Sequence, residues 1–415
     1  MTNAPIMAEH ADDAARARAF DLFNLPEGYF EAPYPWFKLL RDHDPLHANA
    51  DGSVLLTRYE DVRVVWRDLS GVVDRREMFT KRWGQGPLLE HYTTAMLFRD
   101  PPDHDRLRRF VNPLFYPASI ERQRQFVEKT VARLIDEVGE KRDIDFLHEY
   151  ASRIPIAVIC NILGVPQADA AMIQELGRRI LVPLNAKVSQ EIVEQGHEAV
   201  RVFTAYMTDF FVEARKRTEA NPEQDVVSAL IAAERSGGQI SFEEMVHMCI
   251  MMLNGGHETT TNLIATSMHA LLDNPEQMEV LRQEPEIIDT AVEEFIRYVS
   301  PLQFQGRRTT KQVETPAGTI APNVEVMFCQ ASANRDERIF DNPERLNLRR
   351  KMKTPHIAFG AGIHICIGQP LARLEAKIAL PAIVKRFKTI ERAGAARFNP
   401  NPRFRGLEKL PVRLQ

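Results

Sequence analysis

The sequence predicts a mainly α-helical fold with a smaller β part that falls late in the chain. Apolar residues recur at helical spacing, with charges between them, through most of the chain up to Ser300. Short extended segments then follow, namely "QFQGRRTT", "QVETPAGTI" and "VEVMFCQAS". No internal repeat and no linker rich in Gly and Ser separates the two parts. We therefore expect one domain over residues 1–415, in which residues 1–30 form a loosely ordered N-terminal extension.

Composition narrows the class of protein. The chain has 415 residues, of which 44% are hydrophobic and 27% charged, as in ordinary globular proteins. Its net charge of −4 argues against nucleic acid as a partner. The four cysteines show no CxxC spacing, which argues against a disulfide framework and favours a reducing, cytoplasmic location. The most apolar stretches are shorter than the roughly 20 residues that span a membrane, so no membrane partner is expected.

The first two thirds of the chain read as a succession of helices. "PYPWFKLLRDHD" and "YEDVRVVWRD" each carry an apolar face, and a hairpin that turns at Asp51-Gly52 is expected between them. Longer helices are expected near residues 168–182 and 189–217, and a further one near 286–300. Helices should therefore supply most of the core.

One predicted helix is unusually long and apolar. It begins at a capping box formed by Ser241 and Glu244, and Asn274-Pro275 ends it. A helix of this kind must cross the interior rather than lie on the surface. Its centre nevertheless reads "GGHETTT", where each glycine costs roughly 1 kcal/mol against alanine and the polar groups must be desolvated. This local weakness indicates a functional segment.

A second candidate segment is "FGAGIHICIGQPLARLE", which contains one cysteine among glycines. Phe359, Gly362, Cys366 and Gly368 give the spacing F-x-x-G-x-x-x-C-x-G, directly ahead of a strongly helical run. A helix N-terminus and converging backbone N–H groups lower the pKa of a thiol that binds a metal. Gly362 and Gly368 let the backbone fold closely around the sulfur, and Phe359 can shield it from water. The alternative is a buried cysteine that acts as a small hydrophobe.

The cysteine segment resembles the haem-binding loop of the cytochrome P450 family. The resemblance implies the fold of that family, with haem b held between a long distal helix and a proximal loop, and with Cys366 as the axial thiolate ligand of the iron. "GGHETT" resembles the family's oxygen-binding motif. Gly255 and Gly256 would then leave room for dioxygen and substrate, while Glu258 and Thr259 would supply protons as the catalytic pair.

Further motifs extend the resemblance over nearly the whole chain. "EEFIRY" contains Glu294-x-x-Arg297, which in the family pairs with an arginine further along the chain, here Arg345 in "NPERL". This triad would be structural, although a solvated surface pair is the alternative. The resemblance also implies four contacts to the haem propionates, namely His104, Arg108, Arg307 and His364. Arginine suits this role because its fork donates two parallel bonds to a carboxylate.

The resemblance maps the substrate pocket onto mostly apolar residues. These are Trp83, Leu97, Phe98, Met252, Asn254, Leu302, Phe304 and Phe404. Such a lining favours a small or medium hydrophobic substrate, for example a terpenoid or an aromatic compound. Asn254 could hydrogen-bond a polar handle on the substrate; alternatively, it is an ordinary helix residue satisfied by the backbone.

The resemblance also implies a monooxygenase that receives electrons from a separate protein. No flavin or iron–sulfur motif occurs in the chain, so a ferredoxin-type donor with its reductase is expected, with dioxygen as co-substrate. A basic cluster could steer an acidic ferredoxin, unless it is merely a solvated surface. Its members are Arg108, Arg109, Arg349, Arg350, Lys351 and Lys353. A peroxide-driven peroxygenase and a non-catalytic haem or ligand carrier remain the alternative functions.

Overall fold

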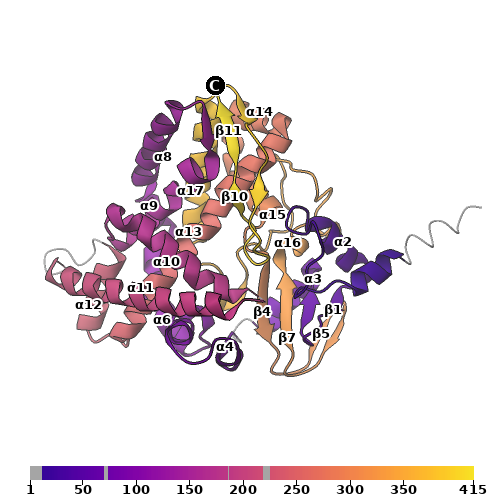
Figure 1. Cartoon of the computed structure of the whole chain (residues 1–415), viewed down its shortest axis with the longest axis horizontal. Helices are drawn as coiled ribbons and strands as arrows, with labels where there is room; N and C mark the ends of the chain where they lie inside the picture. The colour runs from indigo at the N-terminus through magenta and orange to yellow at the C-terminus, as the bar shows by residue number, and fades with distance from the viewer. Residues whose placement is uncertain (1–11, 70–72, 186, 218–224) are drawn as a thin grey trace, which may run out of the picture.

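The computed structural model describes residues 12–69, 73–185, 187–217 and 225–415. Figure 1 shows the helices gathered around α13 (Phe242–Asp273), with most strands at one side of the helical body. The mainly α fold with a smaller β part is confirmed. The hairpin at Asp51-Gly52 is also present, because β1 and β2 pair antiparallel across it.

The α-helices have the following bounds. They are α2 (Tyr34–His43), α3 (Tyr59–Leu69), α4 (Arg76–Trp83), α5 (Pro87–Thr94), α6 (Asp103–Val111), α7 (Pro117–Glu121), α8 (Arg124–Gly139), α9 (Arg153–Leu163), α10 (Ala170–Leu181), α11 (Gln190–Arg217), α12 (Val226–Arg235), α13, α14 (Pro275–Gln283), α15 (Ile288–Val299), α16 (Gln330–Ala333) and α17 (Gln369–Arg386). Shorter 3-10 or π segments are η1 (Met96–Phe98), η2 (Asn112–Phe115), η3 (Leu147–Ala151), η4 (Gln167–Asp169), η5 (Val182–Leu184), η6 (Pro285–Ile287) and η7 (Gly362–His364).

The strands form one four-stranded sheet and three smaller units. They are β1 (Leu46–Ala48), β2 (Val54–Leu56), β3 (Asp143–Asp145), β4 (Phe304–Arg308), β5 (Val313–Thr315), β6 (Gly318–Ile320), β7 (Glu325–Cys329), β8 (Ile390–Arg392), β9 (Arg397–Phe398), β10 (Leu407–Lys409) and β11 (Pro411–Leu414). The larger sheet has the order β1-β2-β7-β4, in which β2 and β7 run parallel. A three-stranded sheet, β3-β11-β8, joins the middle of the chain to its C-terminus.

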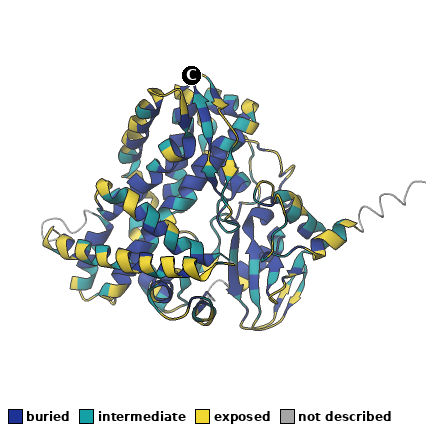
Figure 2. Cartoon of the chain, in the orientation of Figure 1, coloured by how far each residue is buried: buried dark blue, intermediate teal, exposed yellow. Residues whose placement is uncertain are grey.

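Helix α13 crosses the interior as the sequence predicts. Ser241 Oγ accepts from the Glu244 amide at 3.1 Å, and Glu244 Oε2 accepts from the Ser241 amide at 2.9 Å, so the capping box is complete. The helix continues through Gly255 and Gly256 without a break. Figure 2 shows the centre of the helical body buried, whereas α11 exposes one face. Helix α13 thus carries its polar centre into the core.

The N-terminal segment differs from the expectation of loose order. Residues 1–11 lie outside the described residues, but Phe20, Leu22 and Tyr29 are buried in one cluster with Phe37. The prediction is wrong for this described part, because its aromatic side chains pack on α2 and on the larger sheet.

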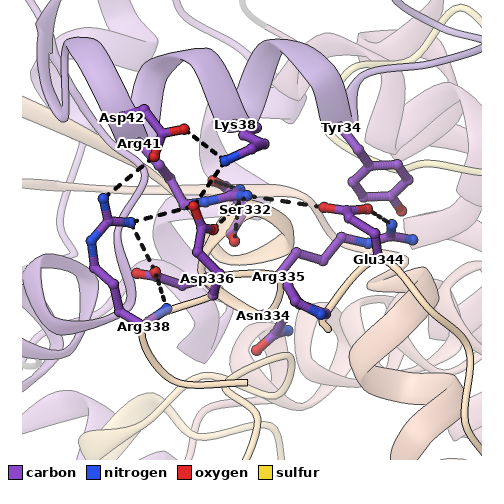
Figure 3. Close-up of polar contacts among 12 residues, drawn as sticks. Tyr34, Lys38, Arg41, Asp42, Ser332, Asn334, Arg335, Asp336, Arg338 and Glu344 are labelled. Carbon is purple, nitrogen blue, oxygen red and sulfur yellow. Dashed lines mark hydrogen bonds and ion pairs between the residues drawn. The ribbon is translucent and has the colours of Figure 1, made fainter. Parts of the chain in front are cut away.

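A polar network joins α2 to the segment that follows β7 (Figure 3). The buried Arg41 donates to the carbonyl and hydroxyl oxygens of Ser332, at 3.2 and 2.9 Å. The Arg335 guanidinium lies 3.4 Å from the centre of the Tyr34 ring and pairs with Glu344. Because α2 is bonded to this segment, the chain that leads to the cysteine loop is anchored at its start. Within the described ranges, no helix is long and apolar enough to cross a membrane.

Candidate active site

A cavity of about 310 Å³ lies between α13 and the segment that contains Cys366. Its walls come from regions that are distant in the sequence, including η1, α13, the chain before β4 and the chain before β10. Its lining is largely apolar and includes Met96, Leu184, Leu263, Ile296 and Leu371. An apolar enclosure with a few polar groups is typical of a small-molecule site.

The cysteine loop is held in a defined shape. The Cys366 amide donates to the Phe359 carbonyl at 2.9 Å, and Gly362 has φ of +73°, which favours glycine. Arg108 of α6 donates to the carbonyls of Ile363 and Ile365, at 2.8 and 2.7 Å. The Cys366 side chain is exposed to the cavity, and α17 begins three residues later. Cys366 is therefore presented to the cavity from the N-terminal end of α17.

The electrostatics of Cys366 differ from the expectation of a simply lowered pKa. Burial within the protein raises the pKa of this thiol, while the Gly368 amide and the guanidinium groups of Arg108 and Arg373 lower it. The contributions that lower the pKa of Cys366 are therefore present. The cost of ionising the thiol in its protein surroundings is larger than their sum. A bound cation at the sulfur would add the missing stabilisation of the thiolate.

The facing stretch of α13 combines open space with polar groups. A Cβ on Gly255 would meet no atom within 4 Å, whereas one on Gly256 would press on Ile159 at 3.0 Å. Gly255 therefore leaves room on the cavity side, and Gly256 mainly permits close packing against α9. Thr259 Oγ1 donates to the Gly255 carbonyl at 3.0 Å. Gly255, Gly256, Glu258 and Thr259 all line the cavity.

Glu258 has an altered acidity. Burial raises the pKa of Glu258 to about 7, and the positive charge of Arg178 opposes this shift. A side cavity of about 10 Å³, roughly the size of one water molecule, lies between α10 and α13 and is lined by both residues. A carboxyl group whose pKa lies near neutrality suits proton transfer.

Three side chains at the edge of the cavity have unsatisfied polar atoms, and a fourth, Arg108, is bonded to carbonyls of the cysteine loop. The rings of His104 and His364 lie 4.0 Å apart, and the Nε2 atom of each is buried without a hydrogen-bond partner. Burial lowers the pKa of both histidines, that of His364 to about 3. Arg307 Nε is likewise unpartnered, and burial lowers the pKa of Arg307 to about 10. Together with Arg108, these groups offer donors to an acidic group in the cavity.

These observations fit a metal held in a flat organic ring with acidic substituents. No three His, Cys, Asp or Glu side chains cluster as a metal site within the described ranges. Cys366 would thus be one protein ligand among ligands supplied mainly by the ring. The unsatisfied donors at the cavity edge match carboxylates, and the apolar walls match the ring itself.

The predicted structural triad is partly wrong. Glu294 and Arg297 are fully buried and form two bonds, at 2.7 and 2.9 Å. The third arginine is Arg350, whose Nε lies 3.0 Å from Glu294 Oε2, whereas the Arg345 side chain is exposed. The backbone turns after residue 345, so that Arg350 binds the Arg345 carbonyl at 3.1 Å and points inward.

Six of the eight predicted substrate residues line the cavity. They are Leu97, Phe98, Met252, Asn254, Leu302 and Phe404. Trp83 and Phe304 do not line it. The Trp83 ring stacks on Phe79 at 4.2 Å, and Phe304 packs against Phe37 because alternate residues of β4 face opposite sides.

The sequence interpretation missed several residues of the cavity wall. These are Arg75, His91, Tyr92 and Arg403. His91 and Tyr92 are buried in α5 and Arg75 directly precedes α4, but no local motif marks any of them as part of a cavity. Of these residues, only Arg403 could have been inferred from the sequence, because it directly precedes Phe404, which was predicted to line the pocket.

Comparison with known proteins agrees with this geometry. The family model described as Cytochrome P450 matches residues 46–406. The polyketide biosynthesis cytochrome P450 PksS of Bacillus subtilis is 34% identical over 401 residues, which cover 92% of this chain and 96% of that protein. The solved structure of CalO2 has a TM-score of 0.88 at 29% identity and covers 96% of this chain and 99% of that one. P450BioI, solved in complex with hexadec-9Z-enoic acid ligated acyl carrier protein, has a TM-score of 0.86 at 32% identity, with coverage of 94% and 100%.

Fold and site together define a haem-binding oxidoreductase. The chain belongs to the cytochrome P450 family. It is a monooxygenase with haem b as its cofactor, and the family generally takes electrons from redox partners such as ferredoxin. The predicted family, fold, enzyme class and cofactor are confirmed.

Proposed function

We propose that Cys366 is the axial ligand of the haem iron and that Glu258 and Thr259 handle protons on the opposite side. One observation carries this proposal, namely that the Cys366 sulfur and the Gly255–Thr259 stretch line the same apolar cavity from two sides. Haem bound here supplies the iron at which dioxygen is activated. Arg108, Arg307, His104 and His364 would hold its propionates, since three of them have unpartnered nitrogen atoms at the cavity edge.

The protein's own groups would then perform proton transfer. The Glu258 carboxyl, whose pKa lies near 7, can hold a proton at neutral pH and release it toward the cavity. Thr259 Oγ1 can turn from the Gly255 carbonyl toward the cavity and donate there. The apolar lining excludes bulk water, which strengthens these interactions.

The substrate would be a small to medium hydrophobic molecule, such as a terpenoid or an aromatic compound, and the enzyme would hydroxylate or oxidatively dealkylate it. The apolar lining of the cavity supports this class. The names of PksS and P450BioI, which refer to polyketide biosynthesis and to a fatty-acyl carrier protein, are compatible with hydrophobic substrates.

The electron donor would be a ferredoxin that docks near the cysteine loop. Three members of the basic cluster are less available than expected, because Arg108 binds loop carbonyls, Arg349 pairs with Glu284 and Arg350 pairs with Glu294. The exposed remainder is Arg109, Lys351 and Lys353. Charge reversal at these three should slow reduction at low ionic strength and leave the carbonyl spectrum unchanged. The three buried cysteines without disulfide partners support a cytoplasmic location.

The first test is the spectrum of the reduced protein with carbon monoxide. A strongly red-shifted Soret band, typical of a thiolate-bound carbonyl complex, is expected for the wild type. Cys366→His should lose this band and almost all monooxygenase activity while it still binds haem. A normal band in Cys366→His would overturn the assignment of the ligand.

A peroxide-driven peroxygenase is the second candidate, and the Glu258-Thr259 pair argues against it. Such an enzyme needs no proton delivery for the activation of dioxygen. In a monooxygenase, Thr259→Ala should divert reducing equivalents into hydrogen peroxide and lower product per electron. Unchanged product per electron, with peroxide supporting full turnover, would favour the peroxygenase. A carrier without activity would form no product in either assay.

A further inference from the structure

Positive charge in the cavity wall exceeds the needs of a bound haem. Four arginines line the cavity: Arg75, Arg108, Arg307 and Arg403. Glu325 lies 2.9 Å from Arg75 and balances one of them. Two haem propionates would balance Arg108 and Arg307, which belong to the edge with His104 and His364. The charge of Arg403, which is half-buried, is left over, and a charge partly withdrawn from water without a counter-charge is costly.

The surroundings of Arg403 contain no compensating acid. Its Nε atom is buried without a partner, and no ion pair to its guanidinium occurs among the described residues. The groups that act on the pKa of Arg403, after burial itself, are Arg75, Tyr92 and Arg82. Two of these are also positive, and the Tyr92 hydroxyl already donates to the Ile180 carbonyl at 2.8 Å. Glu258, the acid on the distal helix, is opposed by Arg178 instead.

The backbone holds Arg403 firmly in place. The Gln303 amide donates to the Arg403 carbonyl at 2.8 Å, and the Arg403 amide donates to Asn401 Oδ1 at 3.0 Å. The next residue, Phe404, forms a β-bridge with Leu302. Both of these apolar side chains line the cavity beside Arg403. The result is a fixed backbone position from which Arg403 extends at the edge of an apolar wall.

We propose that the substrate is an amphiphilic carboxylic acid whose carboxylate binds Arg403. This inference rests on the proposed function and specifies its substrate class. The carboxylate would receive two parallel bonds from the guanidinium, and its hydrocarbon part would lie along Leu302, Phe404 and the apolar wall toward Gly255. Arg75 lies in the same region, but Glu325 already balances its charge. The acidic end is thereby fixed away from the iron, and a carbon further along the chain is presented for oxidation.

The test compares an acid with its neutral ester. Dodecanoic acid and methyl dodecanoate are titrated into the haem-loaded enzyme, and the spin-state shift of the Soret band gives each Kd. We expect wild-type enzyme to prefer the acid and Arg403→Leu to bind the acid roughly 30-fold more weakly, with less than about 3-fold change for the ester. Arg403→Lys, which keeps the charge, should retain part of the preference.

Controls separate this inference from the proposed function. Arg308→Leu is the matched control variant. Arg308 lies on β4 next to Arg307, but its side chain pairs with Glu77 on the outside of the protein. It should bind both ligands as the wild type does. If the wild type lacks the thiolate carbonyl band, the proposed function itself fails. A normal band in both the wild type and Arg403→Leu leaves the proposed function standing. In that case, the role of Arg403 alone is overturned if the wild type binds acid and ester equally, or if the variant loses affinity for both equally. Loss of haem from Arg403→Leu would instead assign Arg403 to a propionate and also overturn it.

Discussion

Two groups of titratable side chains inside this molecule differ in how completely they are bonded. Around Glu294 and Arg297, the hydrogen-bond donors have acceptors. Arg297 donates two hydrogen bonds to Glu294 and also donates to the carbonyls of Asn334 and Pro343, at 2.9 and 3.0 Å. Around the cavity, nitrogen atoms of His104, His364, Arg307 and Arg403 have no partner among the described residues. His104 and Arg307 are buried like Glu294 and Arg297, whereas His364 and Arg403 are half-buried, so burial alone does not distinguish the two groups.

The difference separates structural from functional charge. A buried polar group without a partner costs about 1–3 kcal/mol, and such groups persist where a ligand completes them. The Glu294–Arg297 pair needs no ligand, because its hydrogen bonds are made within the protein, and it ties α15 to the segment that precedes the cysteine loop. The cavity groups are incomplete in the protein alone. The following predictions, ordered by expected effect, probe this distinction.

The largest effect should come from Arg297→Ala. This change leaves the Glu294 carboxylate buried with fewer partners, and breaking a buried pair costs about 3–5 kcal/mol. Urea unfolding should show this loss in the free energy of unfolding, together with weaker haem retention. Replacing a cavity group such as His364 by Gln should leave the free energy of unfolding of the haem-free protein nearly unchanged. Equal losses in both variants would remove the distinction.

Glu258→Gln should be next in size and should appear in activity rather than stability. Since the pKa of Glu258 is about 7, its carboxyl is protonated at lower pH and loses the proton as the pH rises through 7. Coupled product formation in the wild type should therefore fall above this pH. Glu258→Gln should be about 100-fold slower, or about 2.7 kcal/mol, without this pH dependence.

The same pKa has a consequence for stability with a defined sign. A carboxyl whose folded pKa lies above its ordinary value of 4.5 contributes stability at low pH, and this contribution is lost as the pH rises toward 7. Glu258→Gln should remove that slope from the unfolding free energy of the haem-free protein. An unchanged slope between these pH values would show that Glu258 does not titrate there.

A smaller effect should separate Arg350 from Arg345. Arg350→Ala removes an ion pair to Glu294 and three bonds to backbone carbonyls, so we expect about 2 kcal/mol of destabilisation. Arg345→Ala removes an exposed side chain and should change stability by no more than about 0.5 kcal/mol. The reverse order in urea unfolding would restore Arg345 to the structural triad.

This correction illustrates what the sequence can predict. The capping box, the glycine-rich cysteine loop and the polar centre of α13 are local patterns, and each dictates its own geometry over a few residues. Arg345, Arg349 and Arg350 all lie within one short segment, and the turn of the backbone decides which of them reaches Glu294. No periodic pattern encodes that turn.

Residues brought together by long-range pairing were harder to predict. Strand β11 pairs with β3 across most of the chain, and strands of three or four residues carry too weak a pattern to be assigned. Arg75 and Arg403 meet at one cavity although more than three hundred residues separate them. Phe304 was assigned to the pocket because its neighbours were, but in a strand the adjacent side chain points to the opposite face.

The smallest predicted effect concerns Asn254, where a substitution should stabilise the haem-free protein rather than destabilise it. Both polar atoms of this buried side chain lack partners, although the residue lines the cavity and the side cavity next to Gly177. If the pair of polar atoms is kept for a ligand, Asn254→Leu should raise the free energy of unfolding of the haem-free protein by about 1 kcal/mol. It should also weaken binding of a hydroxylated ligand several-fold while leaving its deoxy analogue unaffected.

Asn334→Leu is the matched control, because Asn334 is equally buried but bonded on both sides. Its amide nitrogen donates to Ser300 Oγ at 2.9 Å, and its oxygen accepts from the Ile357 amide at 2.8 Å. This variant should lose about 2 kcal/mol of stability, since the Ile357 amide is then left unpartnered and Ser300 Oγ keeps only its bond to the Arg297 carbonyl. If both asparagine variants were destabilised alike, the unpartnered atoms of Asn254 would have no cost in the protein alone. The contrast between complete and incomplete polar groups would then hold only for charged side chains.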